Sequence, residues 1–77
     1  MKLPRDLSAR KLIKILSRFG YEPSRQTGSH VRVTRPGPPR HSVTVPMKSP
    51  IRVGTLERIL KKVADNLGVS IEDILAD

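Results

Sequence analysis

The sequence predicts an α+β domain in the order α-β-β-β-α, with a three-stranded antiparallel sheet, both long helices on one face of the sheet, and a short C-terminal helix. Two stretches repeat apolar residues at the spacing of one helix face, and the region between them alternates polar and apolar residues as half-buried strands do. The length of 77 residues falls in the size range of one domain, so we expect a single domain over residues 1–77.

The first helix is predicted to follow Ser8, in the stretch SARKLIKILSRFG. Its apolar residues recur at the i, i+3, i+4, i+7 spacing of a helix face that packs in a core, namely Leu12, Ile15, Leu16 and Phe19. Ser8 is expected to cap the first turn by accepting a hydrogen bond from a free amide. Gly20 is expected to end the helix in a left-handed conformation.

Three strands are predicted next. Residues 21–27 suit an edge strand, in which Pro23 would be tolerated. Residues 30–34 and 42–45 alternate, so their valines point to the core and their polar residues to the other face. Residues 35–40 between them contain three prolines and a glycine, which predicts a hairpin with a long basic loop.

The second helix is predicted in LERILKKVADNLG, with Gly54 and Thr55 at its start and Thr55 as the N-cap. Its core residues at helical spacing would be Leu56, Ile59, Leu60 and Val63. Gly68 is expected to close this helix. Ser70, with Asp73 three residues later, resembles a short capping box and predicts a final short helix. The lysines of the two long helices are expected on their solvent-facing sides, namely Lys11, Lys14, Lys61 and Lys62.

Fifteen Lys and Arg against seven Asp and Glu give a formal net charge of +8, which predicts a polyanionic partner. Charge alone does not choose between nucleic acid, an acidic membrane surface and an acidic protein. The excess precedes Lys62, whereas residues 64–77 are acidic. No apolar run is long enough to span a bilayer, and the chain has no cysteine, so we expect a cytoplasmic protein that does not bind membranes. Phe19 and Tyr21 are the only aromatic residues, which argues against a base-stacking surface.

With both helices on one face, the other face of the sheet would be open to solvent. By alternation it would carry His30, Arg32, Thr34, Ser42 and Thr44, beside a loop with Arg35 and Arg40. The order α-β-β-β-α is that of the double-stranded-RNA-binding domain, which contacts phosphates and 2′-hydroxyls. Histidine moves protons near neutral pH, and RNA supplies its own 2′-hydroxyl nucleophile, so such a face could cleave RNA without a metal or a cofactor.

Three segments carry a family resemblance. They are LSARKLIKILSRFGYE in the first helix, TGSHVRVT at the second strand, and HSVTVPMKSPIRVGTLERILKKVA from the third strand into the second helix. Together they resemble the HicA (YcfA-like) mRNA interferase toxins of type II toxin-antitoxin systems. The resemblance implies an endoribonuclease that cleaves mRNA to block translation, with the histidine of the GSH motif, His30, as the catalytic residue. It also implies neutralisation by a HicB-type antitoxin that covers the active face. The toxin would be a monomer when free and a hetero-oligomer with its antitoxin.

The expected RNA-binding residues are Gly28, Ser29, Arg32, Thr34, Arg35, Arg40, His41 and Lys48. Gly28 and Ser29 would shape the turn that presents His30, and Gly54, like Gly28, would serve a special backbone conformation. His41 could be a second proton-transfer group. Lys48 stands where relatives often carry a histidine, and could replace it only as a cation or as an acid.

Two alternatives keep the same scaffold. One is an RNA-binding module without catalytic activity, to which Lys48 in place of the family histidine would point. The other is a protein-interaction module whose basic face binds an acidic protein. RNA binding that weakens steeply with salt would argue against the second alternative.

Overall fold

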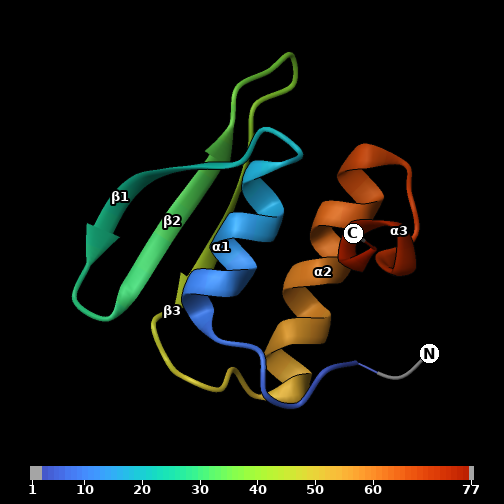
Figure 1. Ribbon diagram of the computed structural model, residues 1–77. Coiled ribbons are helices and arrows are strands. Elements are labelled where there is room, and N and C mark those ends of the chain that lie inside the picture. Colours follow the sequence, from blue (N-terminus) through green and yellow to red (C-terminus); the bar gives the residue numbers. More distant parts are fainter. Residues whose placement is uncertain (1–2, 77) are drawn as a thin grey trace.

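The computed structural model describes residues 3–76, and its elements follow the predicted order (Figure 1). They are α1 (Ala9–Ser17), β1 (Glu22–Thr27), β2 (His30–Arg35), β3 (His41–Pro46), α2 (Val53–Leu67) and α3 (Ile71–Leu75). The predicted α+β class and its α-β-β-β-α layout are therefore confirmed. Asp77, the last residue of the acidic tail, lies outside the described residues.

The three strands form one antiparallel sheet in the order β1-β2-β3. At one end of β2, His30 lies opposite Thr27 of β1 and Pro46 of β3. At the other end, Arg35 lies opposite His41. Next to the hairpin loop, β2 and β3 are therefore each one residue longer than predicted. Strand β1 is an edge strand, as expected, and its register shifts between Pro23 and Arg25. A bulge at an edge accommodates the proline, which has no amide hydrogen for the ladder.

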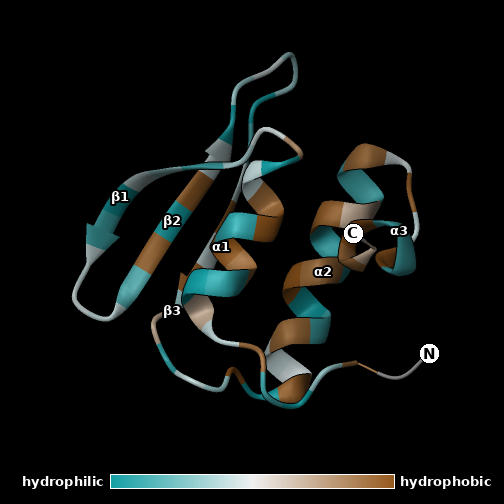
Figure 2. Ribbon diagram, in the orientation of Figure 1, coloured by the Kyte–Doolittle hydropathy of each residue, from teal (hydrophilic) through white to brown (hydrophobic). Residues whose placement is uncertain are grey.

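Both long helices cover the same face of the sheet. Helix α1 contacts β1 and β3, and α2 contacts β3 (Figure 1). The sheet contributes four buried valines to the core, namely Val31, Val33, Val43 and Val45. The apolar sides of α1 and α2 are seen as brown bands in Figure 2, whereas β1 is hydrophilic and exposed along its whole length. The polar side of β2 and β3 is left open to solvent at His30, Arg32 and Thr44.

The ends of α1 follow the sequence prediction. The Ser8 hydroxyl accepts a hydrogen bond from the Lys11 N–H at 3.1 Å. Gly20 adopts a φ of 90°, and the N–H of Tyr21 then donates back to the carbonyl of Leu16 at 3.2 Å. This pattern satisfies a carbonyl that the end of the helix would otherwise leave without a partner.

The start of α2 differs from the prediction. The helix begins at Val53, and Arg52 occupies the N-cap position without a side-chain cap. Thr55 as N-cap is therefore wrong, because Val53 and Gly54 already continue the helix and place Thr55 within its first turn. Gly54 does not have a positive φ, so the expectation of a special conformation there is also wrong. Gly68, with a φ of 69°, ends the helix as predicted.

Helix α3 starts with the predicted capping box. The Ser70 hydroxyl accepts from the Asp73 N–H at 3.0 Å, and the Asp73 carboxylate accepts from the Ser70 N–H at 3.2 Å. These reciprocal bonds allow a helix of only five residues to form. Ile74 is buried, and α3 packs against α1 and α2.

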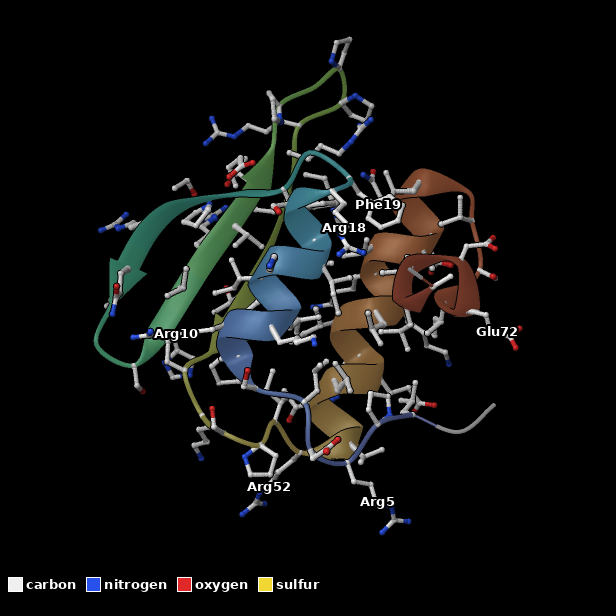
Figure 3. All side chains as sticks on the ribbon, in the orientation of Figure 1. Arg5, Arg10, Arg18, Phe19, Arg52 and Glu72 are labelled. Carbon is white, nitrogen blue, oxygen red and sulfur yellow. The ribbon has the colours of Figure 1, made fainter. Side chains whose placement is uncertain are left out.

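The two aromatic residues depart from expectation. Phe19, predicted in the core, is only half-buried after the end of α1 and points toward α2 in Figure 3. Tyr21 is fully buried, although no apolar period predicted it. The other predicted core residues of α1 and α2 are buried. In the described part of the chain, no helix combines the length and the apolar character needed to cross a membrane.

Candidate active site

His30 is the first residue of β2, and its side chain is exposed on the open face of the sheet. It follows a two-residue turn in which Gly28 has a φ of 58°, a conformation that glycine adopts without steric cost. The carbonyl of Ser29 accepts a hydrogen bond from the Met47 N–H at 2.6 Å. This bond holds the turn against the connector after β3, and the position of His30 therefore depends on both segments.

The same connector brings Lys48 to the site. The backbone N–H of Lys48 donates to the Pro46 carbonyl at 2.8 Å, and the Lys48 carbonyl accepts from the Ala9 N–H at 3.3 Å. A further backbone bond, from the Ile51 N–H to the Leu7 carbonyl at 2.9 Å, ties the connector to the segment before α1. The path of the connector is thus fixed at several points, while the Lys48 side chain is exposed.

His30 lines a cavity of about 530 Å³, called here the His30 cavity. Its polar lining consists of Ser29, His30, Thr44, Lys48, Arg52 and Thr55, and Pro46 and Ile51 complete it. Arg52 lies at the start of α2, as Figure 3 shows. The volume lies within the usual range of ligand-binding clefts, about 300–1,000 Å³. An imidazole and two cationic side chains therefore face a space that can hold part of a substrate.

Two further cavities adjoin the His30 cavity. The β1 cavity, about 220 Å³, is lined by Arg25, Thr27, His30, Arg32 and Thr44. The α2 cavity, about 400 Å³, has the polar lining Arg32, Ser42, Thr44, Thr55, Arg58 and Lys62. Thr44 lines all three, so they meet at the middle of the open face.

Cationic side chains dominate these linings. They are Arg25, Arg32, Lys48, Arg52, Arg58 and Lys62. Within residues 3–76, no Asp or Glu lines any of the three cavities. Cations at this density attract phosphate groups and donate charge-assisted hydrogen bonds to their oxygens. The open face can therefore hold a phosphodiester next to an imidazole.

The structure brings together four of the nine residues that the sequence assigned to the site, and a fifth supports them. Ser29, His30 and Lys48 line the His30 cavity, and Arg32 lines the two cavities beside it. Gly28 contributes the turn before His30. These residues come from β2, from the turn that precedes it and from the connector after β3, which the register places at one end of the sheet.

The remaining four predicted residues lie toward the opposite end of β2 and β3. Thr34 is buried, and its hydroxyl is hydrogen-bonded to Ser24 at 2.7 Å and to Ser42 at 2.9 Å. The Arg35 side chain donates to the Phe19 carbonyl at 3.0 Å. The expectation that Thr34 is exposed on the open face is therefore wrong. The Thr34 hydroxyl and the Arg35 guanidinium instead link neighbouring segments of the fold.

Arg40 is exposed, and it belongs to the loop that joins β2 to β3. That loop is seen in Figure 1 extending beyond the sheet at the end away from the turn before His30. Arg40 therefore lies apart from the six cations around the three cavities.

His41 belongs to a partly buried polar network. Its Nδ1 lies 2.6 Å from the Tyr21 hydroxyl, to which the Asn66 side-chain amide also donates at 3.0 Å. The two rings meet edge to face with centroids 5.7 Å apart. His41 is five residues from Pro46, the partner of His30, which corresponds to about 16 Å along a strand. The two histidines are therefore not brought together.

Burial raises the pKa of Tyr21 above its ordinary value of 10.0, although the Asn66 hydrogen bond and the charge of Arg35 act in the opposite direction. Desolvation penalises the charged phenolate, so the neutral hydroxyl is the form that the fold stabilises. Tyr21 thus serves as a hydrogen-bonding centre between β1, β3 and α2.

Sequence reasoning missed several residues of the site. Arg25 of β1 pairs with Arg32 of β2. To predict this pair, one would need the β1-β2 register and its bulge, which the sequence does not show. The α2 residues Thr55, Arg58 and Lys62 recur at i, i+3 and i+7 and so share one side of the helix. That spacing is visible in the sequence, and Lys62 is exposed as predicted, but nothing in the sequence placed that side of α2 beside β3.

Among the described residues, no group of three or more His, Cys, Asp and Glu side chains is arranged to hold a metal ion. The imidazole and the cations that line the three cavities can provide proton transfer and electrostatic binding of anions.

Comparison with protein families matches residues 9–64 to the family described as the HicA toxin of bacterial toxin-antitoxin. The matched region runs from the start of α1 into α2, and it includes all residues that line the three cavities. Searches of curated proteins and of solved structures found no significant match. Since the match covers most of the chain, the chain belongs to the HicA toxin family, whose members act in toxin-antitoxin pairs.

Proposed function

We propose that this protein is an endoribonuclease that cleaves mRNA, without a metal ion, through His30. The observation that carries the proposal is the His30 cavity, where an exposed imidazole shares a space with two cations, Lys48 and Arg52. Membership of a toxin family supports it, since cleavage of mRNA would block translation.

The proposed reaction uses the 2′-hydroxyl of RNA as its nucleophile. His30 removes the proton from the 2′-oxygen, which attacks the adjacent phosphorus as the bond from phosphorus to the 5′-oxygen breaks. The departing 5′-oxygen takes up a proton, for which Lys48, across the same cavity, is the candidate donor. The products are a 2′,3′-cyclic phosphate and a 5′-hydroxyl end. Lys48 and Arg52 stabilise the negative charge that develops on the phosphoryl oxygens.

The test compares RNA cleavage by the wild type and by His30→Ala, with EDTA present throughout. Loss of a proton-transfer group costs about 10²–10⁴-fold in rate, so we expect cleavage by the variant to fall by that factor. His30 is exposed, so circular dichroism and thermal unfolding should show that the variant folds like the wild type. Mass spectrometry of the wild-type products should find 2′,3′-cyclic phosphate ends.

His41→Ala is the matched control, because it removes the other histidine of the chain from the far end of the sheet. It should retain cleavage. Equal cleavage by wild type and His30→Ala would overturn the proposed role of His30, and a wild type that cleaves only when a divalent cation is supplied would overturn the metal-independent mechanism.

We further propose that a HicB-type antitoxin neutralises the toxin by covering the open face. The absence of carboxylates from the cavity linings of the described residues leaves a basic surface that fits an acidic one. Purified antitoxin should compete with a short single-stranded RNA for His30→Ala toxin, and the free toxin should sediment as a monomer. A ternary complex of toxin, antitoxin and RNA would contradict this arrangement.

Binding of RNA without cleavage is a second candidate function. Lys48 favours it, because an ammonium group is a weaker proton-transfer group than an imidazole near neutral pH. Tight RNA binding by a wild type that yields no cyclic phosphate would support this function, and Lys48→His should then restore cleavage.

A further inference from the structure

The α2 cavity is not used by the cleavage chemistry. It lies between β3 and α2, and its polar lining comes from β2 and β3 on one side and from α2 on the other. Its α2 residues, Thr55, Arg58 and Lys62, occupy one side of the helix. Val43 and Ile59 complete the lining, so the cavity is mainly polar and is a candidate binding site beside the candidate active site.

The α2 cavity adjoins the two cavities that His30 lines. It shares Thr44 and Thr55 with the His30 cavity, and Arg32 and Thr44 with the β1 cavity. A chain molecule bound at His30 can therefore extend past Thr44 into the α2 cavity without leaving the surface. The substrate that would do so is longer than the one phosphodiester that reacts.

The charge of the α2 cavity fits a phosphate backbone. Arg32, Arg58 and Lys62 surround it, with hydroxyls between them. Glu57 and Asp65 also lie on α2, but neither lines the cavity. The guanidinium and ammonium groups can each donate to a phosphate oxygen without competition from a carboxylate.

The cavity offers no aromatic surface for stacking bases. Tyr21 is fully buried and Phe19 half-buried, and neither lines any of the three cavities. Binding here therefore depends on backbone phosphates rather than on base identity, in contrast to single-strand binders that stack bases on aromatic side chains.

We propose that the α2 cavity binds the phosphates of a single RNA strand next to the scissile bond, with Arg58 and Lys62 as its main ligands. This inference rests on the proposed function, because it takes RNA to be the molecule that reaches His30. A single strand can enter between two polar walls, whereas an A-form duplex meets a protein mainly through shape across its shallow groove. The α2 cavity then holds the strand while its reacting phosphate lies in the His30 cavity.

The experiment measures binding of a fluorescent oligouridylate of about 12 nucleotides, within the site sizes of single-strand binders. Full-length His30→Ala toxin is used so that the RNA stays intact. Addition of Lys62→Gln should weaken binding about three- to ten-fold at moderate salt, and should reduce the slope of log affinity against log salt by about 0.7. Addition of Arg58→Gln should have a similar effect.

Lys61→Gln is the matched control, since it removes the same charge from the neighbouring position of α2. Lys61 is exposed and lines none of the three cavities. A second control is Lys11→Gln with Lys14→Gln, because these lysines line a separate basic cavity beside α1. Both controls should bind the oligonucleotide with the affinity and salt slope of the parent His30→Ala toxin, and thermal unfolding should confirm that all variants fold.

Equal losses for Lys62→Gln and Lys61→Gln would overturn the inference, because they would indicate binding by net charge alone. Tighter binding of a duplex of the same length, weakened by the same variants, would also overturn it. These results are separable from the proposed function, which His30→Ala tests by cleavage. RNA bound through Lys62 by a wild type that does not cleave would contradict the proposed function and leave the binding site in place.

Discussion

At the scale of single residues, the two histidines show how position determines what an imidazole can do. His30 is exposed beside Lys48 and lines two cavities. His41 is half-buried, and its Nδ1 is engaged by the Tyr21 hydroxyl. The same side chain therefore has access to a substrate at one end of the sheet and links β3 to the core at the other.

Tyr21 yields a prediction about pH. Its pKa is raised by burial, so the folded state holds the phenolic proton more tightly than the unfolded state does. The associated stability is complete below the unfolded pKa of 10.0 and is lost as pH rises through the higher folded value. The free energy of unfolding of the wild type should therefore fall more steeply above pH 10.0 than that of Tyr21→Phe.

Because the chain has a single tyrosine, its ultraviolet absorbance reports this group directly. The tyrosinate signal should appear with a midpoint above 10.0, and a midpoint at or below this value would contradict the prediction. At neutral pH, Tyr21→Phe leaves His41 and Asn66 without their shared partner, which should cost about 1 kcal/mol of stability.

At the scale of elements, the turns and helix ends decide which side chains reach the site. The turn of Gly28 and Ser29 fixes the register of β1 and β2, and its bond to Met47 fixes the connector after β3. The early start of α2 at Val53 places Arg52 and Thr55 beside the His30 cavity. Small local preferences therefore determine the composition of the cavities.

Two glycines provide a paired prediction. An added methyl group meets nothing within 4 Å at either Gly28 or Gly54. Gly28 has a φ of 58°, so Gly28→Ala should cost about 1–2 kcal/mol of stability, and it should also reduce RNA cleavage by displacing His30. Gly54 lies inside α2, where alanine is preferred, so Gly54→Ala should gain about 0.5–1 kcal/mol.

Chemical denaturation of both variants measures these differences in the free energy of unfolding. A Gly28→Ala protein as stable as the wild type would show that the turn tolerates an ordinary residue. A loss of stability in Gly54→Ala would contradict the absence of crowding at that position.

At the scale of the whole molecule, charge is distributed unevenly. Six of the fifteen Lys and Arg residues line three adjoining cavities, which no Asp or Glu of residues 3–76 lines. The described carboxylates near the C-terminal end include Glu72 and Asp73 in the first turn of α3, and Figure 3 shows Glu72 pointing away from the sheet. This separation gives the open face a positive potential that attracts a polyanion.

The salt dependence of RNA binding tests this distribution. A single strand contributes a slope of about −0.7 per phosphate contact, so three to six contacts with the lining cations predict a slope of about −2 to −4. Fluorescence anisotropy across a salt series, with His30→Ala toxin and oligouridylate, measures it. A slope near zero would favour instead a module that binds an acidic protein.

The sequence by itself determined the order of the elements, most of the core, and the capping of α1 and α3. These features depend on neighbours in the chain, because apolar periodicity and turn residues act over a few positions. The start of α2 was misplaced because Val53 and Gly54 are weak helix formers that the tertiary structure nevertheless keeps helical.

Only the tertiary structure decided which polar residues share the site. Strand register separates Arg35 and His41 from His30, although all were predicted in one site, and burial removes Thr34 from solvent. The packing of α2 against β3 adds Arg58 and Lys62 to the open face. The physical reason is that a binding site is made of contacts between distant parts of the chain, which local periodicity does not encode.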